Sequence, residues 1–177
     1  MNRIGIIYGS DTGVTEDITQ IMVGMMADDH PEVIEVDQVQ EADFHKFDLL
    51  LIGLSTWYDG DLQSDWEDYY ETFKTLDFSD QIVAFYGLGD QYGYAEYFID
   101  GVGILAKVVL ENGGTVIGSW PSAGYEFTAS KALKDDTTFY GLALDEDNQP
   151  ELTEDRLQTW LAQVKQEFAS IEATKVS

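Results

Sequence analysis

The segment Tyr8-Gly9-Ser10-Asp11-Thr12-Gly13-Val14-Thr15 lies between two apolar patterns of different period. The residues before it, Ile4 to Tyr8, form a short continuous apolar run, which is typical of a buried strand. After it, apolar residues recur at helical spacing, at Val14, Ile18, Ile21, Met22 and Met25. We therefore predict a strand, a tight loop and an amphipathic helix.

The loop in this segment has the composition of an anion site. It supplies hydroxyl groups and a glycine but no lysine or arginine, at Ser10, Thr12, Gly13 and Thr15. N–H groups at a helix start, aided by the helix dipole, attract a phosphate group. Loops for nucleoside triphosphates instead carry a Gly-Lys-Ser/Thr signature, which this loop lacks. The loop suits one permanently held phosphate monoester; a capped helix start without a ligand is the alternative.

Two further apolar runs end in glycine-containing loops that carry aromatic residues. Ser55-Thr56-Trp57-Tyr58-Asp59-Gly60 follows the run Leu49 to Leu54, and Gly87-Leu88-Gly89-Asp90-Gln91-Tyr92-Gly93-Tyr94 follows Ile82 to Tyr86. In an open α/β sheet, ligands bind beyond the carboxyl ends of the strands, at the topological switch point. We expect all three loops to meet there. Two aromatic residues could then hold a flat ring while the first loop holds a phosphate, which describes flavin mononucleotide (FMN).

The remaining sequence alternates between strand and helix patterns, as in an α/β protein. We predict strands at residues 33–36 and 115–118, and helices at 65–74, 94–112 and from Thr153 onward. Residues 119–139 are polar and irregular, so they are predicted to interrupt the fifth strand, which resumes at 139–144. Residues 1–177 are expected to form a single domain, with a frayed tail at about 170–177.

The three loops resemble the binding loops of the flavodoxin family. Residues 10–15 are similar to its phosphate loop, and Thr56-Trp57-x-x-Gly60 and Gly87-x-Gly89-Asp90-Gln91-x-Gly93-Tyr94 are similar to its ring-binding loops. Trp120-Pro121, Gly124-Tyr125-Glu126-Phe127 and residues 140–149 resemble the insertion and last strand of the long-chain group. The resemblance runs in register from residue 3 to about residue 168. It implies a flavodoxin-like, doubly wound five-stranded parallel sheet of order 2-1-3-4-5, with helices on both faces and the fifth strand split by the insertion.

The resemblance also implies which residues bind FMN, without a covalent bond. Hydroxyl groups and backbone amides would hold the phosphate, at Ser10, Asp11, Thr12, Gly13, Val14 and Thr15. Trp57 and Tyr94 would stack on opposite faces of the flavin ring. The residues around the ring's polar edge would be Ser55, Thr56, Tyr58, Asp59, Gly60, Gly89, Asp90 and Gln91. Asp147 would contact the ribityl chain. Val14 replaces a residue that is commonly polar or basic in the family, so only its backbone amide would contribute.

On this resemblance the chain is a low-potential one-electron carrier rather than an enzyme. The alternative is an FMN-dependent reductase of quinones or azo compounds that uses NAD(P)H on the same fold. Two aromatic residues over the ring and an acidic rim disfavour that alternative, because nicotinamide needs space and NADPH is anionic. A receiver-type regulatory domain would need an acidic pocket at the first and third strand ends and a late lysine. Ser10 to Thr15 and Thr56-Trp57 occupy those strand ends instead.

Acidic residues far outnumber basic ones, with 34 Asp and Glu against 9 Lys and Arg and a formal charge of −25. Nucleic acids and anionic membranes are therefore unexpected partners, because both are bound through cations. Acidic residues cluster after the tryptophan loop, at Asp59, Asp61, Asp65, Glu67, Asp68 and Glu71. Such charge would steer a basic redox protein, and the resemblance implies a ferredoxin/flavodoxin–NADP reductase and electron-accepting enzymes. A merely solvated acidic helix, or adaptation to a saline habitat, explains the same charge.

The sequence contains no cysteine, which excludes disulfides, thiolate metal sites and iron–sulfur clusters. Redox chemistry would therefore depend on a bound cofactor. Its two histidines, His30 and His45, lack the spacing of a metal site, and no catalytic constellation is visible. No apolar run approaches the ~20 residues of a membrane span, and the first residues lack a signal-peptide pattern. We expect a monomer in the cytoplasm.

Overall fold

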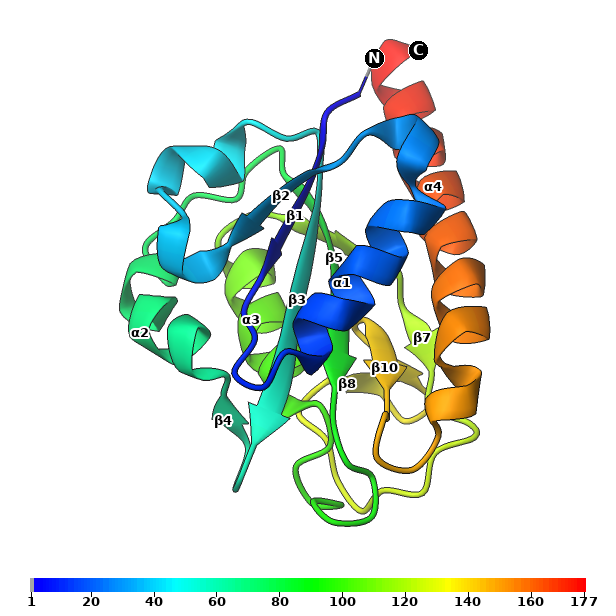
Figure 1. The fold of residues 1–177 in the computed structure, drawn as a ribbon. Coiled ribbons are helices and arrows are strands. Elements are labelled where there is room, and N and C mark those ends of the chain that lie inside the picture. Colours follow the sequence, from blue (N-terminus) through cyan, green and yellow to red (C-terminus); the bar gives the residue numbers. More distant parts are fainter. Residues whose placement is uncertain (1) are drawn as a thin grey trace.

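Continuous apolar runs form the central strands of this computed structural model, which describes residues 2–177 (Figure 1). Strands β1 (Ile4–Tyr8) and β5 (Ile82–Leu88) are buried along their whole length, and β3 (Leu49–Trp57) is buried up to Leu54. Together with β2 (Glu32–Glu35) they pair in parallel in the order β5-β3-β1-β2. Burial on both faces is typical of parallel sheets, whose strands read as unbroken apolar runs.

The fifth strand is divided into two pieces. Strands β6 (Thr115–Ile117) and β10 (Leu142–Leu144) both pair in parallel with β5, which they meet near its start and near its end. The predicted strand order 2-1-3-4-5 is therefore confirmed, with β6 and β10 as the halves of the last strand. The second half begins at Leu142 rather than at residue 139, because Thr138–Phe139 forms strand β9 of another sheet.

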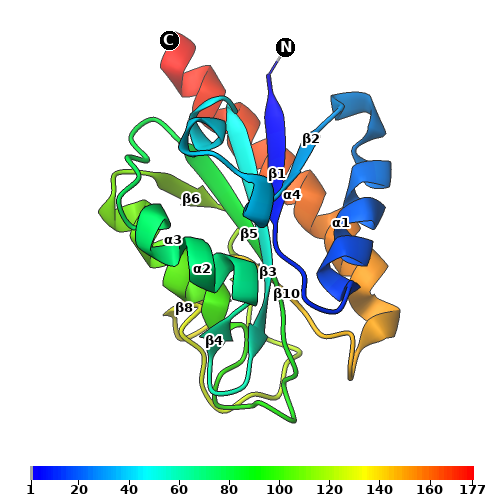
Figure 2. The same cartoon turned by 60° about the vertical axis from the view of Figure 1, so that its left-hand side comes forward.

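Helices cover both faces of the sheet (Figure 2). Helices α1 (Val14–Met25) and α4 (Thr153–Val176) lie on one face, and α2 (Ser64–Phe73) and α3 (Asp100–Glu111) lie on the other. Alternate residues of β3 accordingly belong to different cores, Leu51 packing with Met22 and Trp160, and Ile52 with Phe73 and Leu105. Both cores follow from the period of two in strands and the apolar stripes of the helices.

Two helices depart from the sequence prediction. Helix α3 begins at Asp100 rather than at Tyr94, because the preceding residues form hydrogen-bonded turns such as Tyr94 N–H to the Asp90 carbonyl (3.0 Å). Helix α4 continues to Val176, so the residues expected to form a frayed tail are helical. The shorter elements are η1 (Ala27–Asp29), η2 (Val36–Gln38), η3 (Glu41–His45), η4 (Pro150–Leu152) and β4 (Asp61–Leu62), which pairs with the end of β3. Among residues 2–177, no helix combines the length and apolar composition that crossing a membrane requires.

The insertion that splits the fifth strand has a structure of its own. Strands β7 (Trp120–Pro121), β8 (Leu133–Asp135) and β9 form a small antiparallel sheet of order β7-β9-β8, where the sequence predicted irregular chain. Although the insertion is mostly polar, it has an aromatic cluster at its centre. Phe139 is fully buried and packs against Phe98 and Phe127 at centroid distances of 5.9 and 5.3 Å. Because Phe98 lies just before α3, this cluster attaches the insertion to the main domain.

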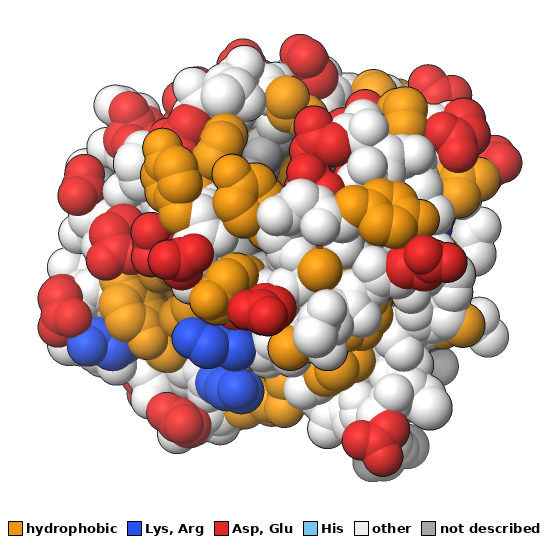
Figure 3. Space-filling view, turned by 90° about the horizontal axis from the view of Figure 1, so that it is seen from below, with side chains coloured by type: hydrophobic (Ala, Val, Ile, Leu, Met, Phe, Trp, Pro, Cys, Tyr) orange, Lys and Arg blue, Asp and Glu red, His pale blue; other side chains and the backbone are white. Residues whose placement is uncertain are grey.

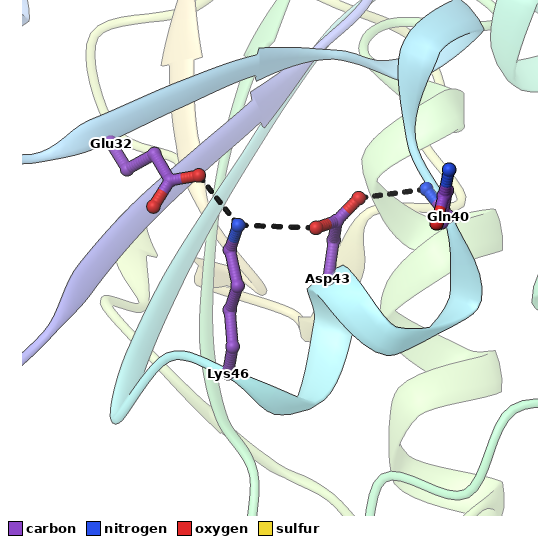
Figure 4. Close-up of polar contacts among 4 residues, drawn as sticks. All are labelled: Glu32, Gln40, Asp43 and Lys46. Atoms are coloured by element: carbon purple, nitrogen blue, oxygen red, sulfur yellow. Dashed lines mark hydrogen bonds and ion pairs between the residues drawn. The ribbon is translucent and has the colours of Figure 1, made fainter.

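Lys46 links strand β2 to the short helix η3 (Figure 4). Its ammonium group lies 2.5 Å from Glu32 Oε1 and 3.1 Å from Asp43 Oδ1. The other carboxylate oxygen of Asp43 accepts a hydrogen bond from the Gln40 N–H (2.8 Å), in a capping box at the start of η3. The bond from Gln40, aided by Lys46, lowers the pKa of the Asp43 carboxyl below its ordinary value of 3.8.

We expect Asp43→Ala to lower the free energy of unfolding at pH 7 by about 1 kcal/mol, the usual contribution of a capping side chain. Asp43→Asn, which keeps an acceptor for Gln40, should lose less. Because the folded-state pKa is lowered, the carboxylate stabilises the protein above its ordinary pKa and loses that effect as pH falls through the folded value. Urea unfolding at pH 7 and at about pH 3 measures both effects. An unchanged deficit at the lower pH would contradict this assignment.

Candidate functional site

A cavity of about 400 Å³ opens where the carboxyl ends of β1, β3 and β5 meet. Its lining residues come from the last residues of β3 and β5, from the first turn of α1, and from the loops after β1, β5 and β10: Ser10, Asp11, Thr12, Val14, Thr15, Ser55, Thr56, Trp57, Leu88, Gly89, Asp90, Tyr94, Glu146 and Asp147. Its volume is within the range of about 300–1,000 Å³ that is usual for small-molecule sites. The three loops singled out in the sequence therefore do converge on one hollow.

The face around this cavity is acidic and partly apolar. Red acidic and orange apolar side chains are interspersed across it, and most of the few basic side chains in view gather at the lower left (Figure 3). The cavity wall contains carboxylates but no lysine or arginine, at Asp11, Asp90, Glu146 and Asp147. An anionic ligand that binds here must therefore be held through neutral groups.

The start of α1 is an uncapped helix N-terminus. Gly13 occupies the position before the helix with φ of 91°, and no side chain caps the helix. Its N–H donates to Ser10 Oγ (3.0 Å), whereas the N–H groups of Val14, Thr15 and Glu16 have no protein acceptor within residues 2–177. These groups and the nearby hydroxyls form a neutral donor set that fits a phosphate. The alternative, a helix start whose N–H groups are capped by a side chain, is not what the structure has at this segment.

The carboxylate of Asp11 is engaged with another helix. It accepts hydrogen bonds from Gln63 Nε2 (3.0 Å) and from the N–H (3.4 Å) and hydroxyl of Ser64. Ser64 is the first residue of α2, so this negative charge faces the positive end of a helix dipole. The sequence analysis missed Gln63, which is buried and also accepts from the Trp66 N–H (3.2 Å) as the N-cap of α2. Its position just before an acidic, helix-forming run was the available signal.

The tryptophan loop is fixed at Thr56, whose Oγ1 accepts a hydrogen bond from the Gly101 N–H (2.9 Å). Trp57 forms part of the cavity wall, and its indole Nε1 is buried without a partner among the described residues. Tyr94, from the next loop, lines the same cavity and is 46% exposed. Tyr94 therefore offers an exposed aromatic surface in the same cavity as the unpaired Nε1 of Trp57. A flat ring with a polar edge could stack against such a surface.

Residues 57–60 form a tight turn, closed by a hydrogen bond from the Gly60 N–H to the Trp57 carbonyl (3.1 Å). Tyr58 has φ of 47° and Gly60 has φ of 91°, both in the left-handed region. A side chain at Gly60 would also collide with the Asp100 carboxylate, since its Cβ would lie 2.7 Å from Oδ2. Tyr58, Asp59 and Gly60 do not line the main cavity, although Tyr58 lines an adjoining hollow with Asp61, Glu67 and Asp68.

In the tyrosine loop (residues 89–94), Gln91 forms hydrogen bonds within the protein. Gln91 is fully buried, and its backbone N–H and its side-chain Nε2 both donate to Asp145 Oδ2, at 3.1 and 2.8 Å. Its Oε1 accepts from the Glu126 N–H (2.7 Å), which ties the loop to the insertion. The Gln91 N–H is therefore engaged within the protein, so the predicted contact of this loop with the ring edge would use other backbone groups. Gly13 also does not line the cavity, and its N–H donates to Ser10 Oγ.

The loop after β10 brings two acids to the cavity, Asp147 as expected and Glu146 in addition. Partial burial, together with the nearby charges of Asp90 and Asp145, raises the pKa of the Asp147 carboxyl. Glu146 accepts a hydrogen bond from the Thr153 hydroxyl at the start of α4. The sequence analysis missed Glu146, which adjoins Asp147 and could have been included on that ground.

These features define a doubly wound α/β protein with a nucleotide-type site at the carboxyl edge of its sheet. Residues 6–160 match the family model described as Flavodoxin. A flavodoxin of Klebsiella pneumoniae is 45% identical over 168 residues, covering 95% of this chain and 96% of that protein. Flavodoxin 1 of Escherichia coli K12 is 44% identical over 164 residues, covering 93% of each chain.

A solved structure of Fusobacterium nucleatum flavodoxin bound to flavin mononucleotide is also similar. It superposes with a TM-score of 0.89 at 30% sequence identity, covering 95% of this chain and 99% of that one. The similarity thus extends over nearly the whole of both chains. The chain belongs to the flavodoxin family.

The turn at Tyr58 generates a prediction about stability. A side chain in the left-handed region costs roughly 1–2 kcal/mol, more than the entropic cost of glycine. We expect Tyr58→Gly to exceed Tyr58→Ala in unfolding free energy by about 1 kcal/mol, since both variants lack the phenol and differ only at Cβ. Urea unfolding of the pair measures the difference. Equal stabilities would mean that the turn relaxes without strain in the alanine variant.

Proposed function

We propose that this protein is a low-potential one-electron carrier that binds FMN non-covalently in the cavity at the sheet edge. The observation that carries the proposal is that uncapped N–H groups of α1 and two aromatic side chains, Trp57 and Tyr94, belong to one cavity. The FMN-bound relative from Fusobacterium nucleatum supports the identity of the ligand. Bound FMN supplies a centre that takes up and releases electrons one at a time.

The protein's residues would bind and orient this group. The N–H groups and hydroxyls of residues 10–15 would hold the phosphate, and Trp57 and Tyr94 would cover the ring. The carboxylates of Asp90, Glu146 and Asp147 line the same cavity. Because each further negative charge is disfavoured near them, they would lower the potential for adding electrons. Asp147, which lines the cavity, would contact the ribityl chain.

We also assign the chain to the long-chain group of the family. This finer assignment rests on the insertion between β6 and β10 and on its Trp120-Pro121 and Gly124–Phe127 motifs. The rival function, a reductase that uses NAD(P)H, is less well supported. The cavity wall has carboxylates and no basic residue among those described, so it would repel the anionic NADPH.

The proposed partners are basic redox proteins, such as a ferredoxin/flavodoxin–NADP reductase as donor and electron-accepting enzymes as acceptors. Support comes from the hollow beside Trp57, which Asp61, Glu67 and Asp68 line. These acids are close to the proposed position of the ring and would attract a cationic surface to it. We propose that the protein acts as a monomer.

The phosphate loop can be tested by titrating the FMN-free protein with FMN and with riboflavin, and recording the flavin absorption bands. The unsubstituted chain should bind about one FMN. Thr12→Val with Thr15→Val removes two hydroxyl donors, each bond to a charged group being worth roughly 1.5–3 kcal/mol. We expect FMN affinity to fall by about two decades or more, whereas riboflavin affinity should barely change. Equal losses would place the phosphate elsewhere, and a chain that takes up no FMN would refute the proposed function.

The acidic hollow generates a prediction about partners. Electron transfer with a basic reductase should slow steeply between about 0.01 and 0.5 M salt, because the Debye length shrinks from ~30 Å to a few ångström. Neutralising the hollow with Asp61→Asn, Glu67→Gln and Asp68→Asn should flatten this dependence. Glu151→Gln, Glu154→Gln and Asp155→Asn, near the start of α4, provide a matched control of equal charge change. Stopped-flow kinetics that respond equally to both sets would exclude a specific docking role for the hollow.

A further inference from the structure

We propose that Asn148 is a positioning residue, which holds the tyrosine loop (residues 89–94) against the cavity by bridging the carboxylates of Asp90 and Asp145. The inference rests on the proposed function, since the loop carries one of the two aromatic residues assigned to the flavin ring. Asn148 does not line the cavity itself. It acts through Asp90, and through Asp90 on Tyr94.

The side-chain amide of Asn148 is shared between the two acids. Its Nδ2 lies 2.8 Å from Asp90 Oδ1, and 3.1 and 2.9 Å from the two oxygens of Asp145. An amide nitrogen carries two hydrogens, so each carboxylate can receive one. Within residues 2–177, neither acid forms an ion pair with a lysine or arginine, so this amide is the group that joins them.

Asp90 organises the tyrosine loop. Its Oδ1 accepts hydrogen bonds from the N–H groups of Tyr92 (3.0 Å) and Gly93 (2.7 Å), and its carbonyl accepts from the Tyr94 N–H (3.0 Å). A Cβ at Gly93 would lie 2.4 Å from Asp90 Oδ2, so the turn is wrapped closely around the carboxylate. A displacement of Asp90 therefore carries Tyr94 with it.

Asp145 is the fixed end of the bridge. It directly follows β10, it is fully buried, and it accepts from the backbone and side chain of Gln91 and from the Asn148 N–H (3.0 Å). The neighbouring Gly89 N–H donates to the Leu144 carbonyl (3.0 Å), so both loops start from paired ends of β5 and β10. Asn148 adds a second connection between the two loops, through its contacts with Asp90 and Asp145.

Without the Asn148 amide, the carboxylates of Asp90 and Asp145 would repel each other. Burial alone would raise the pKa of the Asp90 carboxyl, but bonds from Gly93, Asn148 and Tyr92 outweigh burial and lower it. The raised pKa of Asp147 reflects burial and the same nearby charges. Removing the Asn148 donor leaves Asp90 facing Asp145 without a shared hydrogen-bond donor, and the loop can relieve the repulsion by moving away from the cavity.

The test compares Asn148→Leu with the unsubstituted chain by titration of the FMN-free protein with riboflavin and FMN. Leucine has a similar size and no donor. We expect both affinities to fall by the same factor, roughly tenfold for one lost bond to a charged group. The ratio of riboflavin to FMN Kd should stay constant because the phosphate loop is untouched. Flavin bound to the variant should be more fluorescent, since Tyr94 no longer covers the ring.

Further variants distinguish positioning from general destabilisation. Asn112→Leu is the matched control, because Asn112 Nδ2 likewise bridges two acceptors, the Lys74 and Leu76 carbonyls, away from the cavity. It should lower stability without changing flavin affinity. Asn148→Asp, which keeps the shape and adds a charge, should bind flavin more weakly than Asn148→Leu. Adding Asp90→Asn to Asn148→Leu should recover part of the loss by removing the repulsion.

The inference is overturned if Asn148→Leu and Asn148→Asp both bind riboflavin as tightly as the unsubstituted chain. It is also overturned if Asn112→Leu loses as much flavin affinity as Asn148→Leu does, because the effect would then be general. Failure of the unsubstituted chain to bind FMN has a different meaning. That result would refute the proposed function itself and is read from the control titration alone.

Discussion

The burial of β3 and β5 on both faces is the constraint on which the rest of the structure depends. Strands without a solvent-facing side need helices above and below them, and this arrangement is typical of parallel sheets. This arrangement directs the carboxyl ends of β1, β3 and β5 to one edge, where their loops meet. The residues that line the cavity therefore come together from segments that are far apart in the sequence.

Hydrogen bonds are the main stabilisation of the carboxylates at this edge, and the charges of Lys131 and Lys107 contribute at Asp100. Asp11 accepts hydrogen bonds at the start of α2, Asp145 accepts them from amides of Gln91 and Asn148, and Asp100 accepts one from the Lys131 N–H. Burial outweighs that one bond at Asp100, because the pKa of its carboxyl is raised. Lysine is used as a counter-ion elsewhere, as at Lys46 beside β2. The cavity therefore keeps its negative field while its walls remain ordered.

Local sequence was sufficient to predict what depends on local pattern. The central strands and the convergence of three loops follow from apolar runs and glycine-containing loops, whereas the order of the strands was implied by the resemblance to the family. Contacts between distant segments could not be predicted in this way. Gln91 is turned inward by Asp145 and Glu126, and α3 starts late because Asp90 organises the turn before it. The small sheet of the insertion was missed because its strands have only two or three residues, too few to show a period.

The division of the fifth strand has a consequence for how such a chain can change its length. Ile117 pairs with Ala84 and Leu142 with Tyr86, so only the level of Phe85 separates the two halves along β5. Everything between them leaves and rejoins the sheet at nearly one point. An excision or a graft there would leave the strand register intact, and loop-closure entropy depends only weakly on length. The effect would instead be felt at the Phe98–Phe139 packing and at the Gln91–Glu126 contact. Evolution or design could therefore alter the binding edge at this junction while the strand register stays the same.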